Sequence, residues 1–111
     1  MARHRRMYVH SQAYHISART SEGLPFMCNL LMKSVLFGII ARARSLYPNV
    51  KICAWLFMGN HFHAILVNKG DSNCIPDFME FVNGEVARAI NRFRGRRNYK
   101  VWATRYKVEH L

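Results

Sequence analysis

Acidic residues are scarce in this chain of 111 residues, which has six Asp and Glu against seventeen Lys and Arg. The formal net charge at pH 7 is therefore +11. A charge excess of this size describes the partners of a protein rather than its fold. It argues against a mimic of acidic proteins and against a binder of cationic ligands. It favours a polyanionic partner, most often a nucleic acid.

Cysteine is also rare, with three residues in the whole chain. Cys28, Cys53 and Cys74 form no C-x-x-C pair, so their spacing supports neither a zinc site nor a redox-active pair. We expect all three to be free, structural cysteines in a reducing, cytoplasmic compartment.

Long uninterrupted hydrophobic runs are absent. The nearest candidate, residues 24–40, contains Lys33 and is interrupted early by Pro25 and Asn29. We therefore expect a buried helix there and no membrane span. Because half of the residues are hydrophobic and 13% are aromatic, the chain can bury a modest core, and we expect one domain over residues 1–111.

The hydrophobic patterns predict six elements: strands over 8–19, 50–58, 61–68 and 99–108, and helices over 26–47 and 75–93. In the first strand Tyr14 alternates with polar neighbours, which predicts one buried face. The nearly unbroken apolar run at 50–58 predicts a central strand buried on both faces, and Gly59-Asn60 predicts a hairpin turn. In the second helix, apolar residues at steps of three and four predict an inward stripe of Met79, Val82, Val86, Ile90 and Phe93. The order β-α-β-β-α-β predicts an α+β, ferredoxin-like fold, with an antiparallel sheet and two helices on one face.

His61-Phe62-His63 is the motif with the most chemical content. Residues i and i+2 of a strand project from the same face, with Cα atoms about 7 Å apart. Both imidazoles can therefore reach one divalent ion while Phe62 points to the opposite layer. A pair of exposed strand histidines without a ligand is the simpler alternative.

The block Met58-Gly-Asn-His-Phe-His-Ala-Ile-Leu resembles the M-P-N-H-x-H block of the REP-associated tyrosine transposases, members of the single-tyrosine HUH transposase superfamily. Three other stretches agree in matching order: Tyr14-His-Ile-Ser-Ala-Arg-Thr, Ala89-Ile-Asn-Arg and Trp102-Ala-Thr-Arg-Tyr-Lys. Gly59 replaces the proline that is usual in this family.

The resemblance implies that His61 and His63 bind Mg²⁺ or Mn²⁺ together with an amide or acidic side chain. It also implies that a tyrosine attacks a DNA phosphate and forms a 5′-phosphotyrosine. In the family this tyrosine and the third ligand belong to a further helix, within a segment like Y-x-x-x-N-P, which this sequence lacks. The catalytic nucleophile is therefore unknown, and Tyr106 is the best internal substitute because Arg105 and Lys107 flank it. The nucleophile helix could also come from a partner chain, and a homodimer is left open.

Basic residues are concentrated near the end of the chain, with aromatic residues between them. Arginine and lysine side chains neutralise phosphates, while aromatic rings stack on bases of single strands. We expect DNA contacts from Arg88, Arg92, Arg96, Arg97, Lys100, Trp102, Arg105, Tyr106 and Lys107. Asn60 either orients a backbone phosphate or closes the turn.

Three hypotheses follow. The first is a metal-dependent transposase that cleaves and rejoins single-stranded or hairpin DNA. The second is a non-catalytic DNA-binding module of the same fold. The third is an unrelated ferredoxin-like RNA-binding domain, which would need aromatic residues in the middle of strands on the exposed sheet face.

Overall fold

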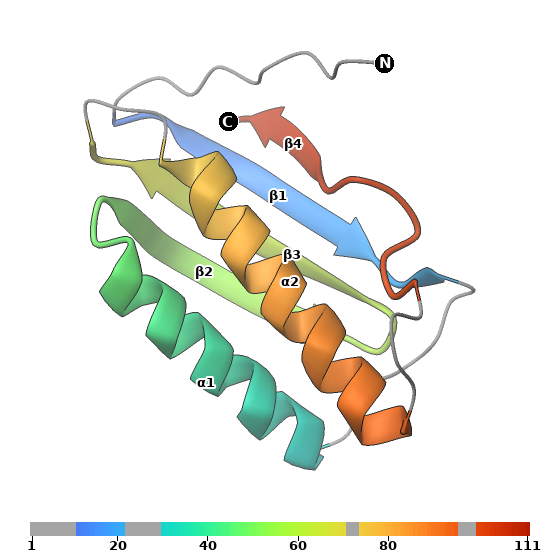
Figure 1. Ribbon diagram of the computed structural model, residues 1–111. Helices are drawn as coiled ribbons and strands as arrows, with labels where there is room; N and C mark the ends of the chain where they lie inside the picture. The colour runs from blue at the N-terminus through green and yellow to red at the C-terminus, as the bar shows by residue number, and fades with distance from the viewer. Residues whose placement is uncertain (1–10, 22–29, 71–73, 96–99) are drawn as a thin grey trace.

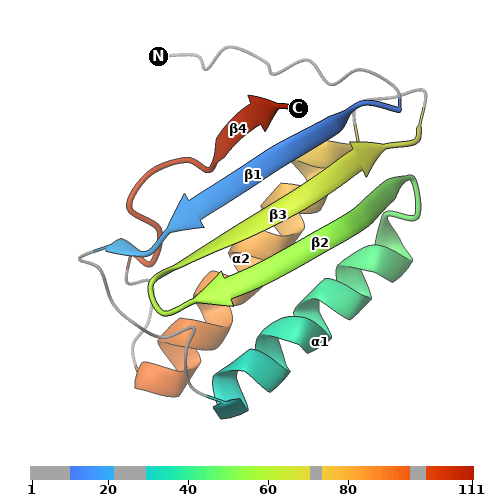
Figure 2. The same cartoon turned by 180° about the vertical axis from the view of Figure 1, so that it is seen from behind.

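A computed structural model describes residues 11–21, 30–70, 74–95 and 100–111 of the chain. Its elements follow the predicted order: β1 (Ala13–Arg19), α1 (Leu30–Leu46), β2 (Val50–Met58), β3 (His61–Asn68), α2 (Ile75–Arg94) and β4 (Lys107–His110). The four strands form one antiparallel sheet in the order β2-β3-β1-β4. Both helices cover one face of this sheet, and the other face is open (Figures 1 and 2). The ferredoxin-like α+β fold is confirmed.

The buried core lies between the sheet and the helices. Tyr14 and Ile16 of β1 point into it, as their alternation predicts. The stripe of α2 is also confirmed, except for Phe93, which is 54% exposed in the last turn of the helix. Gly95 caps the end of this helix: its left-handed backbone (φ 69°) lets its N–H bond to the carbonyl groups of Asn91 and Arg92.

The prediction that residues 50–58 form a central strand buried on both faces is wrong. β2 pairs only with β3 and is an edge strand. Its register shifts between Ile52 and Ala54 because Cys53 forms a bulge. The bulge turns Trp55 and Phe57 toward the helices and leaves apolar side chains on the open face, so the run shows no alternation. Cys53 itself is exposed, contrary to the burial predicted for both faces of this strand.

The last predicted strand is also wrong in extent. Only Lys107–His110 forms β4, and the preceding residues cross the end of β1 with a single bridge between Thr20 and Trp102. Within the described residues, no helix is both long and apolar enough to cross a membrane. The beginning of the first predicted strand and of the first predicted helix, Cys28 and the turn at 96–99 lie outside the described residues.

Candidate metal and nucleic-acid site

The two histidines of the H-x-H motif lie on the open face of the sheet, near the start of β3. Pairing with β1 places Arg19 opposite His61 and Ser17 opposite His63. Phe62 points the other way and is fully buried. Its ring stacks on Trp55 with centroids 4.9 Å apart and meets Trp102 edge-on at 5.6 Å. The aromatic core therefore fixes the strand from which both imidazoles project.

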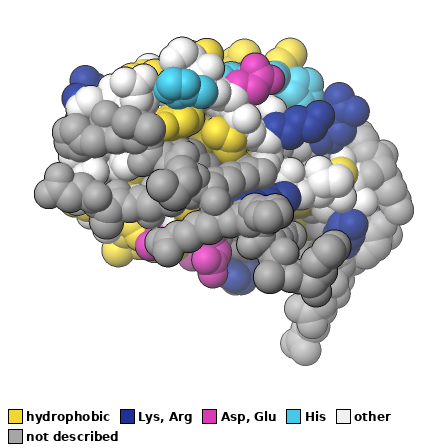
Figure 3. Space-filling model, turned by 90° about the horizontal axis from the view of Figure 1, so that it is seen from above, with side chains coloured by type: hydrophobic (Ala, Val, Ile, Leu, Met, Phe, Trp, Pro, Cys, Tyr) yellow, Lys and Arg dark blue, Asp and Glu magenta, His cyan; other side chains and the backbone are white. Residues whose placement is uncertain are grey.

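The histidines share a pocket of about 340 Å³ with three basic side chains, Arg19, Arg105 and Lys107. The pocket forms where the segment before β4 lies beside the end of β1 (Figure 2). In Figure 3, Lys and Arg side chains gather at one end of the molecule, beside a histidine. The described lining of the histidine pocket also includes the hydroxyl groups of Ser17 and Thr104, and it contains no Asp or Glu. Such a lining attracts an anion.

Each histidine of the motif is held by a hydrogen bond at its Nδ1 atom. His61 Nδ1 lies 2.8 Å from Asn60 Oδ1, and His63 Nδ1 lies 2.9 Å from Nε2 of His15. The His15 and His63 rings are nearly parallel, with an angle of 15° between their planes and centroids 5.1 Å apart. The His61 and His63 rings are 5.0 Å apart and nearly perpendicular. The motif therefore has a defined orientation before any ligand arrives.

The pKa of His63 is lowered from its ordinary value of 6.5. Partial burial is the largest cause because it disfavours the charged ring, and the neighbouring His15 and His61 lower the pKa further. His63 is therefore neutral at neutral pH, which is the state that binds metal ions.

A divalent metal ion fits these residues in part. Two imidazoles on one face are suitable ligands, but no three His, Cys, Asp or Glu side chains in the described chain form a group that could hold a metal ion. His15 does not complete such a group, since its Nε2 is engaged by His63. His61 and His63 would fill two coordination positions and leave the others to oxygen atoms from elsewhere.

Asn60 has two structural contacts in the hairpin turn. Its backbone carbonyl accepts hydrogen bonds from the N–H group of Thr20, at 2.8 Å, and from the Thr20 hydroxyl, at 3.1 Å. Its side chain contacts His61. Asn60 thus joins the hairpin to the end of β1 and orients a histidine. A contact with phosphate stays a prediction.

The predicted basic residues do not form one surface. Arg105 and Lys107 lie at the histidine pocket, whereas Arg88 and Arg92 belong to α2, on the opposite side of the sheet. Arg88 also pairs with Glu85 at 3.0 Å. Lys100 lines a groove between α2 and the segment before β4, to which Arg105 also contributes, and residues 96 and 97 lie outside the described chain.

The aromatic residues expected to contact DNA pack into the protein instead of facing the pocket. The Trp102 indole N–H donates to the carbonyl oxygen of Asn83 at 2.9 Å, and Tyr106 is 8% exposed. Tyr14 is also buried, and Tyr47 packs against phenylalanine rings of α2. None of the described tyrosines lines the histidine pocket; Tyr8 and Tyr99 lie outside the described residues.

Four residues of the site were missed by the sequence reasoning: His15, Ser17, Arg19 and Thr104. The first three alternate along β1 with buried residues. This alternation places them together on the polar face of the strand and could have identified them as candidates. Their proximity to the H-x-H motif depends on the register between β1 and β3, which the sequence does not reveal. Thr104 comes from an irregular segment that was predicted as a strand.

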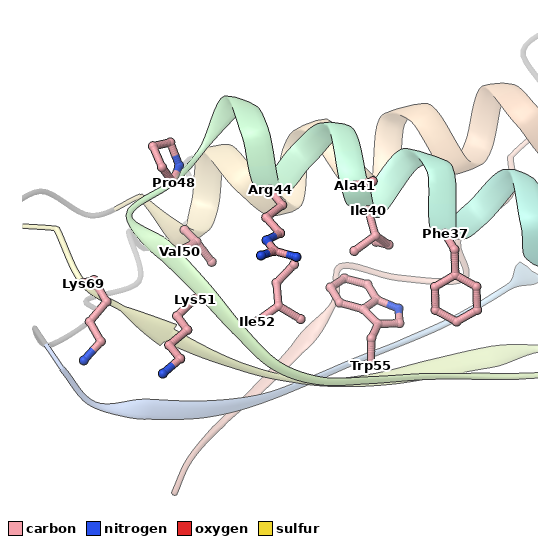
Figure 4. A pocket seen from close by; sticks show the side chains of 10 residues that line it. All are labelled: Phe37, Ile40, Ala41, Arg44, Pro48, Val50, Lys51, Ile52, Trp55 and Lys69. Atoms are coloured by element: carbon pink, nitrogen blue, oxygen red, sulfur yellow. The ribbon is translucent and has the colours of Figure 1, made fainter.

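A larger cavity, about 760 Å³, lies between α1 and β2 on the helix side (Figure 4). Phe37 and Ile40 of α1 face Ile52 and Trp55 of β2 across it. Its basic side chains are Arg44, Lys51 and Lys69. None of the residues of the H-x-H motif lines this cavity, so its size does not make it the functional site.

Comparison with solved structures confirms the class of fold. The structure of a REP-associated tyrosine transposase bound to a REP hairpin matches all of this chain with a TM-score of 0.76 and 15% sequence identity. This chain spans 62% of the length of that protein. A crystal structure of a candidate transposase from Deinococcus radiodurans R1 matches 99% of this chain, with a TM-score of 0.73, 20% identity and 86% of its own length covered.

At these identities the matches establish a shared fold, not a shared activity. No protein-family model matches the sequence, and no curated protein matches it either. The chain thus has the fold of tyrosine transposases.

Proposed function

We propose that this chain binds single-stranded or hairpin DNA at the pocket around His61 and His63, on the open face of its sheet. We further propose that these two histidines hold Mg²⁺ or Mn²⁺ for strand cleavage and rejoining through a 5′-phosphotyrosine. The observation that carries the proposal is one pocket that joins two oriented imidazoles to Arg19, Arg105 and Lys107. The transposase bound to a hairpin, which has the same fold, adds support.

Each group of the pocket has a role in this proposal. The three cationic side chains neutralise DNA phosphates and place the backbone over the histidines. A bound divalent cation would supply Lewis acid stabilisation of the charge that grows on a phosphoryl oxygen during attack. The lowered pKa of His63 keeps this ring neutral and able to act as a ligand.

A non-catalytic DNA-binding module is the second candidate, and the placement of the tyrosines favours it. Tyr14, Tyr47 and Tyr106 all pack against the protein core. Attack on a phosphate held at the histidines would need a tyrosine from outside the described residues or from a second chain. The open sheet face argues against the RNA-binding alternative, because its described residues include no Phe, Tyr or Trp.

The test is to incubate the protein with labelled single-stranded DNA that carries a hairpin, with and without Mn²⁺. A native gel measures binding, and a denaturing gel detects a covalent adduct that protease removes. We expect salt-sensitive binding, and an adduct that the double variant His61→Ala/His63→Ala abolishes. Binding without an adduct supports the non-catalytic module. Absence of binding overturns the proposal.

A further inference from the structure

The hydrogen bonds on the two motif histidines suggest a function for their partners. We infer that Asn60 and His15 are positioning residues, each of which accepts a hydrogen bond from the Nδ1–H group of a motif histidine. Both rings then carry their proton on Nδ1 and present the Nε2 lone pair to a shared cation. This inference rests on the proposed metal site and identifies the residues that prepare it.

The contact between Asn60 and His61 defines the tautomer of His61. A carboxamide oxygen can only accept a hydrogen bond, so Nδ1 of His61 must donate across the 2.8 Å contact. In a neutral ring the proton on Nδ1 leaves Nε2 unprotonated. This nitrogen is then free to bind a metal ion, and the ring cannot turn without losing its hydrogen bond.

The contact between His15 and His63 permits two arrangements. If His15 donated from Nε2, a neutral His63 would carry its own proton on Nε2 and could not bind a metal ion there. If His63 donates from Nδ1, its Nε2 is free, and it points away from His15 because the two ring nitrogens diverge. We infer the second arrangement, because only it leaves Nε2 of His63 free for the proposed metal ion.

In this arrangement the imidazole of His15 accepts the hydrogen bond from a metal-binding histidine. In other metal sites this acceptor is usually a carboxylate or carbonyl group. Removing such a partner typically lowers metal affinity about 10- to 100-fold. The same range is expected for His15→Phe, which keeps an aromatic ring of similar size but has no acceptor. His15→Gln keeps an acceptor oxygen and should retain most of the affinity.

The first measurement records the protonation of the imidazole nitrogens in the metal-free protein, by long-range ¹H–¹⁵N NMR at about pH 7.5, above the unperturbed pKa of histidine. We expect His61 and His63 to be protonated on Nδ1. In His15→Phe we expect His63 to lose this preference while His61 keeps it. In Asn60→Ala we expect His61 to lose this preference while His63 keeps it.

The second measurement is calorimetric titration of the same variants with Mn²⁺. His110→Phe is the matched control, because His110 is also a strand histidine but bonds to Gln12 at 3.0 Å, away from the motif. We expect a 10- to 100-fold loss for His15→Phe, a small loss for His15→Gln and no loss for the control. Unfolding midpoints establish that each variant is folded.

The two measurements separate the inference from the proposed function. A proton on Nε2 of His63 in the wild-type protein overturns the inference, whatever the metal affinity. So does an unchanged Mn²⁺ affinity in His15→Phe when the wild type binds. If the wild type binds no Mn²⁺, the metal part of the proposed function is wrong, and the NMR result still decides whether His15 and Asn60 accept the two hydrogen bonds.

Discussion

Replacing the three cations of the histidine pocket should change the salt dependence of DNA binding by a predictable amount. We consider the triple variant Arg19→Gln/Arg105→Gln/Lys107→Gln. On single strands, each neutralised phosphate contributes about 0.7 to the slope of log affinity against log salt. Three lost contacts should flatten the slope by about 2. Between about 50 and 200 mM salt, wild-type affinity should therefore fall about 18-fold more than that of the variant.

A second triple variant, Arg44→Gln/Lys51→Gln/Lys69→Gln, is the matched control. Each triple variant lowers the formal net charge from +11 to +8, so the long-range attraction to DNA changes equally. The control residues line the cavity between α1 and β2. Fluorescence anisotropy with a labelled single-stranded oligonucleotide, at four or more salt concentrations, gives both slopes. An equal flattening in both variants would refute the pocket as the DNA site and leave only non-specific attraction.

Three further outcomes are expected. Phe62→Ala should lower the free energy of unfolding in urea by about 3–5 kcal/mol, because it removes the centre of the aromatic core, whereas the half-exposed Phe93→Ala should cost much less. Metal-free protein should lose stability as the pH falls below about 6.5. The pKa of His63 is lowered in the folded state, so the unfolded chain takes up its proton first, and His63→Gln should weaken this trend in urea titrations at several pH values. Mn²⁺ should bind more tightly once hairpin DNA is present, and DNA more tightly with Mn²⁺ by the same factor, which calorimetry can measure in both directions.

The fold could be predicted from sequence because its strands and helices have clear periodicities. The alternation around Tyr14 and the stripe through Val82 and Val86 each identify a buried face. The position of β2 could not be predicted in the same way. Its apolar run has two causes, a bulge at Cys53 that shifts the alternation and apolar side chains on the open face of an edge strand. Burial on both faces produces the same pattern.

The site was predictable only as far as it is local in sequence. The spacing of His61 and His63 places both rings on one face, and Arg105 and Lys107 were among the predicted DNA contacts. His15 is 48 residues from His63 in sequence, and only the register of β1 against β3 brings the rings together. The predicted basic cluster is divided for a related reason, because Arg88 and Arg92 lie on α2, on the helix side of the sheet, whereas Arg105 and Lys107 line the pocket on its open face.

The scarcity of acidic residues and the structure of the pocket account for the expected coupling between cation and DNA. With only imidazoles as described ligands and three basic side chains nearby, the free protein offers a divalent ion little electrostatic attraction. DNA phosphates would neutralise these side chains and contribute oxygen ligands, so cation and DNA should favour each other. A site with its own carboxylates would depend less on DNA for its affinity for the cation. If Mn²⁺ binds equally well with and without hairpin DNA, this reasoning is wrong.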